Sequence, residues 1–315
     1  YLYRMRNIVN ISDISGIKLI DFIHEKFNWV VILDKHLDKT LLVRTSSKAN
    51  IIQYKPKAGT NKEYKLIVSS SEYIQKLSDQ NNDHAYYDRL YRKLISIMKN
   101  DNLSREEIIN AVNRVKGISG ALVLKVIGKG KFAHEMLATY LSYKRRSIND
   151  DKQLQVWSTC DDLPWFSNNK RRPDLAITTI SEGEGKLCLS IELVELKFVA
   201  ESIFDTERHD ALKQIKSGLT VLNKLFNFSK PSLDTNYWKQ EFIQYLIEKE
   251  AYKPEHVYLI KRLQEADVES IEMTINGCAD VYCYTTNLSN TSFEKLEDGV
   301  YLDKIDSSTE NYIFN

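Results

Sequence analysis

One long apolar run limits the possible folds of this chain more than any other feature of its sequence. Residues 187–198 are mainly apolar, as expected of a central β-strand that is buried on both faces. A shorter β-rich run, residues 175–180, precedes it. The segment between them, residues 181–186, is polar and contains Gly183 and Gly185. The two runs therefore predict a β-hairpin.

Ionisable residues stand where this predicted hairpin opens. Asp174 directly precedes the first strand, and Glu195 and Lys197 lie near the end of the second. Residues two apart on a strand point to the same face, so the Glu195 carboxylate and the Lys197 ammonium should be neighbours. Charges inside a buried strand are unfavourable unless they pair or bind a metal. We therefore expect a divalent metal between the two carboxylates, beside an ammonium that orients water or stabilises a phosphate.

A structural interpretation of the same motifs stays open. Pro-Asp before a strand, here residues 173–174, is often part of a turn. Glu-x-Lys on an edge strand, here residues 195–197, is often a solvated ion pair. The length of the apolar run favours a central strand and therefore the metal site. Glu192 points to the face opposite Glu195, so we expect it to pair with a basic residue on a covering helix.

The order of these motifs resembles that of the PD-(D/E)XK nuclease superfamily, over roughly residues 126–230. That family carries Pro-Asp at one strand and Glu-x-Lys on the next, between two helices. Residues 131–141 match the first helix and place Glu135 at its glutamate position. Residues 205–226 have apolar side chains at helical spacing, and Gln214 resembles a glutamine that some branches carry there. The resemblance implies an α/β fold with a restriction-endonuclease-like core, in which helices flank a mixed sheet.

The resemblance also implies a metal-dependent deoxyribonuclease that hydrolyses phosphodiester bonds in double-stranded DNA. Asp174 and Glu195 would hold Mg²⁺, or Mn²⁺ as a substitute, and Glu135 would be a further ligand directly or through water. The ion would polarise the scissile phosphate and lower the pKa of a water that Lys197 positions. Two alternatives stay open: an inert nuclease fold that binds DNA or a partner protein, and an enzyme that uses the same carboxylates on RNA.

Basic residues near the expected site are candidates for contacts with DNA phosphates. The candidates for DNA contact are Arg171, Arg172, Lys213, Gln214 and Lys216. A second basic strip, residues 144–146, ends the helix that carries Glu135. The net charge of the whole chain is only +1, so DNA contacts would come from local patches and not from the whole surface. A solvated loop is the alternative interpretation of Arg171 and Arg172.

The composition, 43% hydrophobic and 28% charged residues, is that of an ordinary globular protein. No apolar stretch approaches the length of a transmembrane helix, so we expect a cytoplasmic protein without a membrane partner. The four cysteines have no Cys-x-x-Cys spacing and predict reduced thiols instead of a zinc site. His134 stands beside Glu135, but helix neighbours face different directions, so we expect a structural role for it.

Two domains are predicted along the 315 residues. Residues 1–125 would form an N-terminal α/β accessory domain, and residues 126–315 the nuclease-like domain with a helical insertion near residues 228–256. In the first domain we expect strands at 29–33, 50–54 and 64–69, a helix at 86–98, and another helix opened by a capping box at 104–107. In the second, Asn276-Gly277 predicts a hairpin between strands 271–275 and 279–286, the latter being the last strand of the sheet.

A second resemblance concerns the front half of the chain. The order of several segments is similar to that of the C-terminal region of bacterial phosphorothioation-dependent restriction DNA translocases. These segments are residues 28–34, 51–54, 64–68, 112–115 and 120–124. In those proteins a motor domain precedes a nuclease-like tail, which implies a role in restriction or phage defence and an ATP-dependent motor domain or subunit outside this chain. The chain has no phosphate-loop spacing, and its start at Tyr1 is typical of a piece of a longer protein or of a chain lacking its first residues.

Overall fold

The chain divides into two compact units, which we describe separately. A computed structural model describes residues 23, 27, 29–34, 50–54, 65–70, 85–98, 104–126, 131–150, 152–167, 171–183, 185–232, 234–250, 254–283, 292–297 and 299–306. The smaller unit consists of residues 1–56 and 62–84, and the larger of residues 57–61 and 85–315. The predicted boundary at residue 125 therefore lies inside the larger unit.

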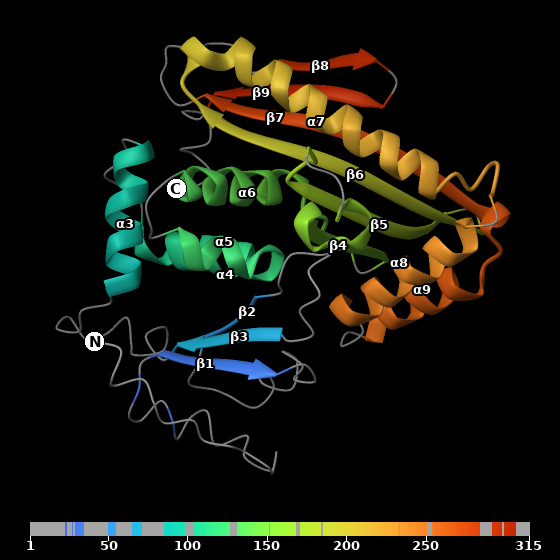
Figure 1. Cartoon of the computed structure of the whole chain (residues 1–315), viewed down its shortest axis with the longest axis horizontal. Helices are drawn as coiled ribbons and strands as arrows, with labels where there is room; N and C mark the ends of the chain where they lie inside the picture. Colours follow the sequence, from blue (N-terminus) through green and yellow to red (C-terminus); the bar gives the residue numbers. More distant parts are fainter. Residues whose placement is uncertain are drawn as a thin grey trace. The chain divides into compact units, whose positions relative to one another are not determined.

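The smaller unit contains a three-stranded antiparallel sheet (Figure 1). Its strands are β1 (Trp29–Asp34), β2 (Asn50–Tyr54) and β3 (Lys65–Ser70), in the order β1-β3-β2. The three predicted strands of this region are thus confirmed. β3 lies between the other two strands and pairs antiparallel with both.

Four helices open the larger unit. They are α3 (Ala85–Met98), α4 (Arg105–Ile118), α5 (Gly120–Lys125) and α6 (Phe132–Arg146). The side chain of Ser104 accepts a hydrogen bond from the backbone N–H of Glu107, so the predicted helix start is confirmed. Lys93 on α3 donates a hydrogen bond of 2.9 Å to the Val126 carbonyl. α3, α4 and α5 pack with α6, which explains why the unit begins at α3 and not after residue 125.

A mixed six-stranded sheet forms the centre of the larger unit (Figure 1). The strands are β4 (Gln153–Thr159), β5 (Leu175–Gly183), β6 (Lys186–Val199), β7 (Ile271–Cys283), β8 (Ser292–Glu297) and β9 (Val300–Asp306). Their order is β4-β5-β6-β7-β9-β8, so the long apolar run is confirmed as a central strand. β5 and β6 form the predicted hairpin, and Gly185 in its turn has φ 80°, which glycine adopts without strain.

The hairpin predicted at Asn276-Gly277 is wrong. β7 runs without interruption through both residues and pairs in parallel with β6. Gly277 is required for close approach of a helix, because a Cβ there would lie 2.4 Å from the Cγ2 atom of Ile215. β7 is also not the last strand of the sheet, since β9 pairs in parallel with it and β8 pairs antiparallel with β9.

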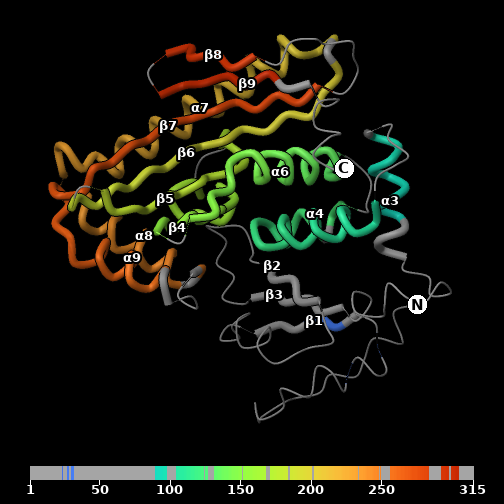
Figure 2. Tube along the Cα trace, turned by 180° about the vertical axis from the view of Figure 1, so that it is seen from behind, coloured from blue at the N-terminus to red at the C-terminus, as the bar shows by residue number. Residues whose placement is uncertain are grey.

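Helices cover both faces of the sheet, as Figures 1 and 2 show for α6 and α7 (Phe204–Leu225). The alternation of side chains along β6 explains this arrangement. Glu192 and Phe198 face α6, where Arg146 lies 3.4 Å from the Glu192 carboxylate. Leu193 faces α7, whose Gly218 lets the helix approach closely. The predicted pairing of Glu192 with a basic residue on a covering helix is therefore confirmed.

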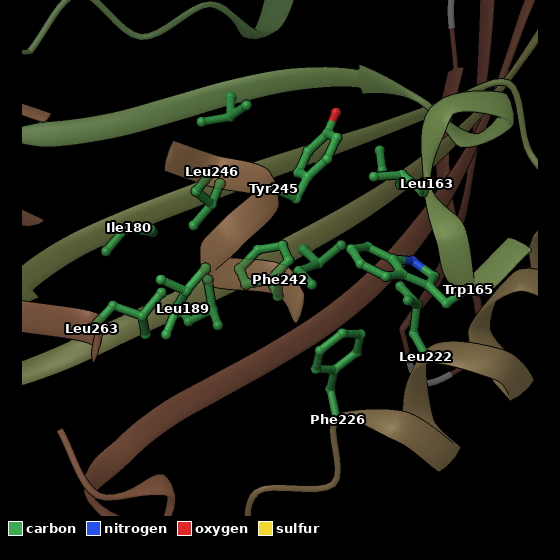
Figure 3. Close-up of a cluster of buried hydrophobic side chains, with 14 of the residues drawn as sticks. Leu163, Trp165, Ile180, Leu189, Leu222, Phe226, Phe242, Tyr245, Leu246 and Leu263 are labelled. Atoms are coloured by element: carbon green, nitrogen blue, oxygen red, sulfur yellow. The ribbon is translucent and has the colours of Figure 1, made fainter. Parts of the chain in front are cut away.

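A large hydrophobic core lies where the helical insertion packs against the hairpin (Figure 3). The insertion consists of α8 (Thr235–Glu250) and α9 (Pro254–Glu265), so it extends beyond the predicted limit at residue 256. Trp165 packs edge-on against Phe226, with ring centroids 5.4 Å apart. Leu189 of β6 and Phe242 of α8 belong to the same cluster. Within the described ranges, no helix has the length and apolar character needed to cross a bilayer.

Candidate active site

Asp174 and Glu195 come together at the open end of the β5–β6 hairpin. The last paired residues are Leu175 and Val194, so Asp174 and Glu195 occupy the next opposed positions. The Asp174 carboxylate accepts a hydrogen bond of 2.9 Å from the backbone N–H of Leu196. This bond ties Asp174 directly to the strand that carries Glu195.

The two oxygens of the buried Glu195 carboxylate have different surroundings. Oε1 lies 2.8 Å from the Lys197 ammonium and also accepts a hydrogen bond from the Gln214 side-chain amide on α7. Oε2 is buried as well, but no residue in the described part of the chain donates a hydrogen bond to it. A buried carboxylate oxygen without a donor is unfavourable, so this oxygen is suited to a cation or a proton.

Lys197 lies between two carboxylates. Besides its contact with Glu195, its ammonium is 3.9 Å from Oε2 of Glu207, in the first turn of α7. Burial by itself would lower the pKa of Lys197, but the negative charges of Glu195 and Asp174 outweigh it and raise the pKa. Lys197 is therefore charged at neutral pH.

The environment that keeps Lys197 charged favours the neutral, protonated form of the carboxyl groups. Burial, followed by the negative charge of Asp174, holds the pKa of Glu195 well above its ordinary value. Burial also raises the pKa of Asp174, although the hydrogen bond from Leu196 opposes this shift. The carboxyl groups therefore resist being charged together.

Glu135 reaches this site from α6. Desolvation by the surrounding protein is the main cause that raises the pKa of Glu135 to about 7, and the negative charge of Asp174 is the second. The residue as a whole remains exposed to solvent, so we place its side chain at the margin of the site and not in its buried centre. Its neighbour His134 packs against Phe198, with ring centroids 5.5 Å apart, which agrees with the expected structural role.

The residues fit a divalent cation in part. Three acidic side chains with raised pKa face one ammonium, and the bare Oε2 of Glu195 offers an oxygen ligand of the kind that Mg²⁺ prefers. Asp174 and Glu195 are the residues that would hold the ion, with Glu135 beside them. Among the described residues, however, no group of three or more His, Cys, Asp or Glu side chains is already arranged for a metal. The geometry thus offers the buried Glu195 carboxylate and the half-buried Asp174 carboxylate, and leaves Glu135 to move or to act through water.

The proposed DNA contacts occupy different environments. Arg171 is exposed, while Arg172 pairs with Asp161. Lys213 lies 4.0 Å from Asp210, and Lys216 lies 3.1 Å from Glu297 on β8. Gln214 binds Glu195, so it belongs to the acidic site and not to an outer basic surface.

The strip at residues 144–146 is not an unpaired basic surface. Arg145 pairs with Asp303 on β9. Arg146 binds both oxygens of the fully buried Asp280 on β7, at 2.5 and 2.6 Å. Arg145 and Arg146 therefore hold α6 against the sheet through ion pairs with carboxylates on β9 and β7.

Two acidic residues near the site were not predicted from the sequence. Glu207 approaches Lys197 from α7, and its only signal in the sequence is an acidic residue in the first turn of the helix after the Lys197 strand. Asp161 follows β4, and its charge contributes to the raised pKa of both Glu135 and Asp174. All four cysteines are free thiols, as the sequence predicts.

The chain has no match that would assign this site by similarity. No protein-family model, curated protein or solved structure matches it.

Proposed function

We propose that the larger unit has a restriction-endonuclease-like core and is a divalent-metal-dependent endonuclease acting on double-stranded DNA. The observation that carries this proposal is the buried Glu195 carboxylate, which has two donors on Oε1 and none among the described residues on Oε2. Asp174 lies opposite it, and Lys197 adds a positive charge. The mixed sheet with helices on both faces supports the fold assignment.

Each residue of the site would have a distinct task. A bound Mg²⁺ would supply positive charge at the scissile phosphate and lower the pKa of a bound water. Asp174 and Glu195 would hold the ion, and Gln214 would keep the Glu195 carboxylate in the rotation that leaves Oε2 available. Lys197 would donate hydrogen bonds to the attacking water or to the phosphate. Glu135, with a pKa of about 7, would complete the acidic site as a further ligand.

A second candidate function is an inert nuclease fold that binds DNA or a partner protein. Two observations favour it: the described residues contain no ready group of three metal ligands, and two of the basic residues expected to contact DNA, Arg172 and Lys216, already pair with carboxylates. On this alternative the Lys197–Glu195 pair is structural, and Asp174 only accepts a hydrogen bond from the backbone of β6.

A cleavage assay separates the two functions. Modified and unmodified duplex DNA, and an RNA duplex, are incubated with the protein in Mg²⁺, Mn²⁺ or EDTA, beside Lys197→Ala. The nuclease proposal expects metal-dependent DNA cleavage that Lys197→Ala abolishes. Duplex binding without cleavage in any metal would support the inert fold, and cleavage confined to RNA would replace the proposed substrate.

A further inference from the structure

We propose that Glu207 is a positioning residue for Lys197, which it holds at the edge of the site when a divalent cation occupies Glu195. The inference rests on the proposed metal-dependent function and assigns a role to a residue that no sequence motif marked. The Lys197 ammonium has two carboxylate neighbours, Glu195 at 2.8 Å and Glu207 at 3.9 Å.

The two neighbours differ in where they are attached. Glu195 is buried on β6 and shares its strand face with Lys197. Glu207 is only partly buried and belongs to the first turn of α7, a separate element. The ammonium can therefore move from one carboxylate towards the other by side-chain rotation alone, without movement of either backbone.

Electrostatics gives this rotation a direction. A divalent cation on Glu195 repels the nearby ammonium and competes with it for the same carboxylate. Glu207 supplies an anionic partner on the side of α7, so Lys197 keeps a counter-charge while it yields Glu195. Without Glu207 the ammonium would stay on Glu195 and oppose metal binding.

A simpler role for Glu207 is stabilisation of α7, since an acidic side chain in the first turn interacts favourably with the helix dipole. Asp205 provides a matched control, because it is an exposed acidic residue of the same turn. Asp205→Asn and Glu207→Gln remove the same charge from the same helix end. Of these two acidic residues, only Glu207 forms an ion pair with Lys197 in the described part of the chain.

The test measures Mg²⁺ affinity by titration calorimetry on the whole chain, with the melting temperature of each variant taken in EDTA. Glu207→Gln should weaken Mg²⁺ binding by about 10- to 100-fold, the loss typical for a residue that supports a metal ligand. Asp205→Asn should change it by no more than about twofold, as screened charges at a helix end do. Glu207→Asp, which keeps the charge, should recover most of the loss.

A double substitution tests the route of the effect. In a Lys197→Met background, Glu207→Gln should leave the Mg²⁺ affinity unchanged, because the competing ammonium is gone. Equal weakening by Glu207→Gln and Asp205→Asn, or an effect of Glu207→Gln that persists without Lys197, would overturn the inference and leave the nuclease proposal standing. Absence of Mg²⁺ binding by the unsubstituted protein would instead reject the proposed function itself.

Discussion

The ammonium of Lys197 lies 2.8 Å from Oε1 of Glu195, on the same face of the central strand β6. A buried ion pair of this kind has either a structural or a catalytic role. Lys197→Met separates the two, since methionine keeps much of the apolar stem and removes the charge. If Lys197 serves catalysis, the variant folds normally and cleaves DNA at least about a hundredfold more slowly.

If the pair is structural, the same variant loses about 3 to 5 kcal/mol of unfolding free energy, because Glu195 is left buried without its counter-charge. Melting temperature and cleavage rate are measured on one preparation, with Lys186→Met, an exposed lysine of the same strand, as the control. An unstable variant with a normal rate per folded molecule would reject the catalytic role.

Asp174→Asn should abolish cleavage and leave the fold intact. Asparagine keeps a side-chain oxygen that can accept the hydrogen bond from the Leu196 N–H, but it removes the negative charge that would hold the metal. We expect Mg²⁺-dependent cleavage to fall by more than about a hundredfold, while duplex binding measured by fluorescence anisotropy is retained. Asp161→Asn removes a nearby charge that pairs with Arg172 and should retain cleavage. Full activity of Asp174→Asn would locate the catalytic site elsewhere.

Stability without metal should fall as the pH rises. Folding raises the pKa of Glu135 from 4.5 to about 7, and those of Asp174 and Glu195 in the same direction. The folded protein then holds protons that the unfolded chain releases, so the stabilisation is complete below the unfolded pKa values and is lost as pH rises through the folded ones. In EDTA, the melting temperature should drop between about pH 5 and about pH 8.

Glu135→Gln should make this drop smaller, and Mg²⁺ should restore stability at the alkaline end, since bound cations favour charged carboxylates. Calorimetric scans at several pH values, with and without Mg²⁺, check both effects. A pH dependence that Glu135→Gln leaves unchanged would show that Glu135 does not titrate in this range.

The pair of Arg146 and Asp280 should be a major stabilising contact of α6. Asp280 is fully buried, and Arg146→Met would leave its charge without the two hydrogen bonds at 2.5 and 2.6 Å. We expect a loss of about 3 to 5 kcal/mol in chemical denaturation. Lys261→Met breaks the exposed pair with Glu265 on α9 and should change stability by less than about 1 kcal/mol. Similar losses from the two variants would contradict a special role for the buried pair.

Gly277→Ala should destabilise the larger unit through packing alone. The new methyl group would lie 2.4 Å from the Cγ2 atom of Ile215, so the Ile215 side chain, or α7 with it, must shift away from β7. Overpacking of this kind costs about 1 to 3 kcal/mol. Gly183→Ala serves as the control on a strand, because nothing lies within 4 Å of a Cβ at that position. Denaturation midpoints of the two variants decide whether the glycine is needed for close approach.

Local patterns were sufficient for the elements on which the site is built. The β5–β6 hairpin, the helix with Gln214 and the start of α4 at Ser104 follow from periodicity, turn glycines and a capping residue, which are all short-range signals. The same signals failed at Asn276-Gly277. There the glycine is needed because α7 packs closely over it, but in the sequence Asn-Gly cannot be distinguished from a turn.

The polar C-terminal strands were also missed. β8 is exposed along most of its length, so it lacks the apolar alternation by which a strand is recognised. It pairs with β9, whose own place beside β7 depends on contacts far apart in the sequence.

The sequence by itself determined which side chains of β6 share a face, because alternation along a strand is a local property. It thereby joined Glu195 to Lys197 and assigned Glu192 to the opposite face. The tertiary structure alone decided which oxygen of Glu195 receives two donors, and that Glu207 approaches Lys197. Those contacts depend on how closely α7 lies on the sheet, and this distance is set by packing between elements that no local pattern encodes.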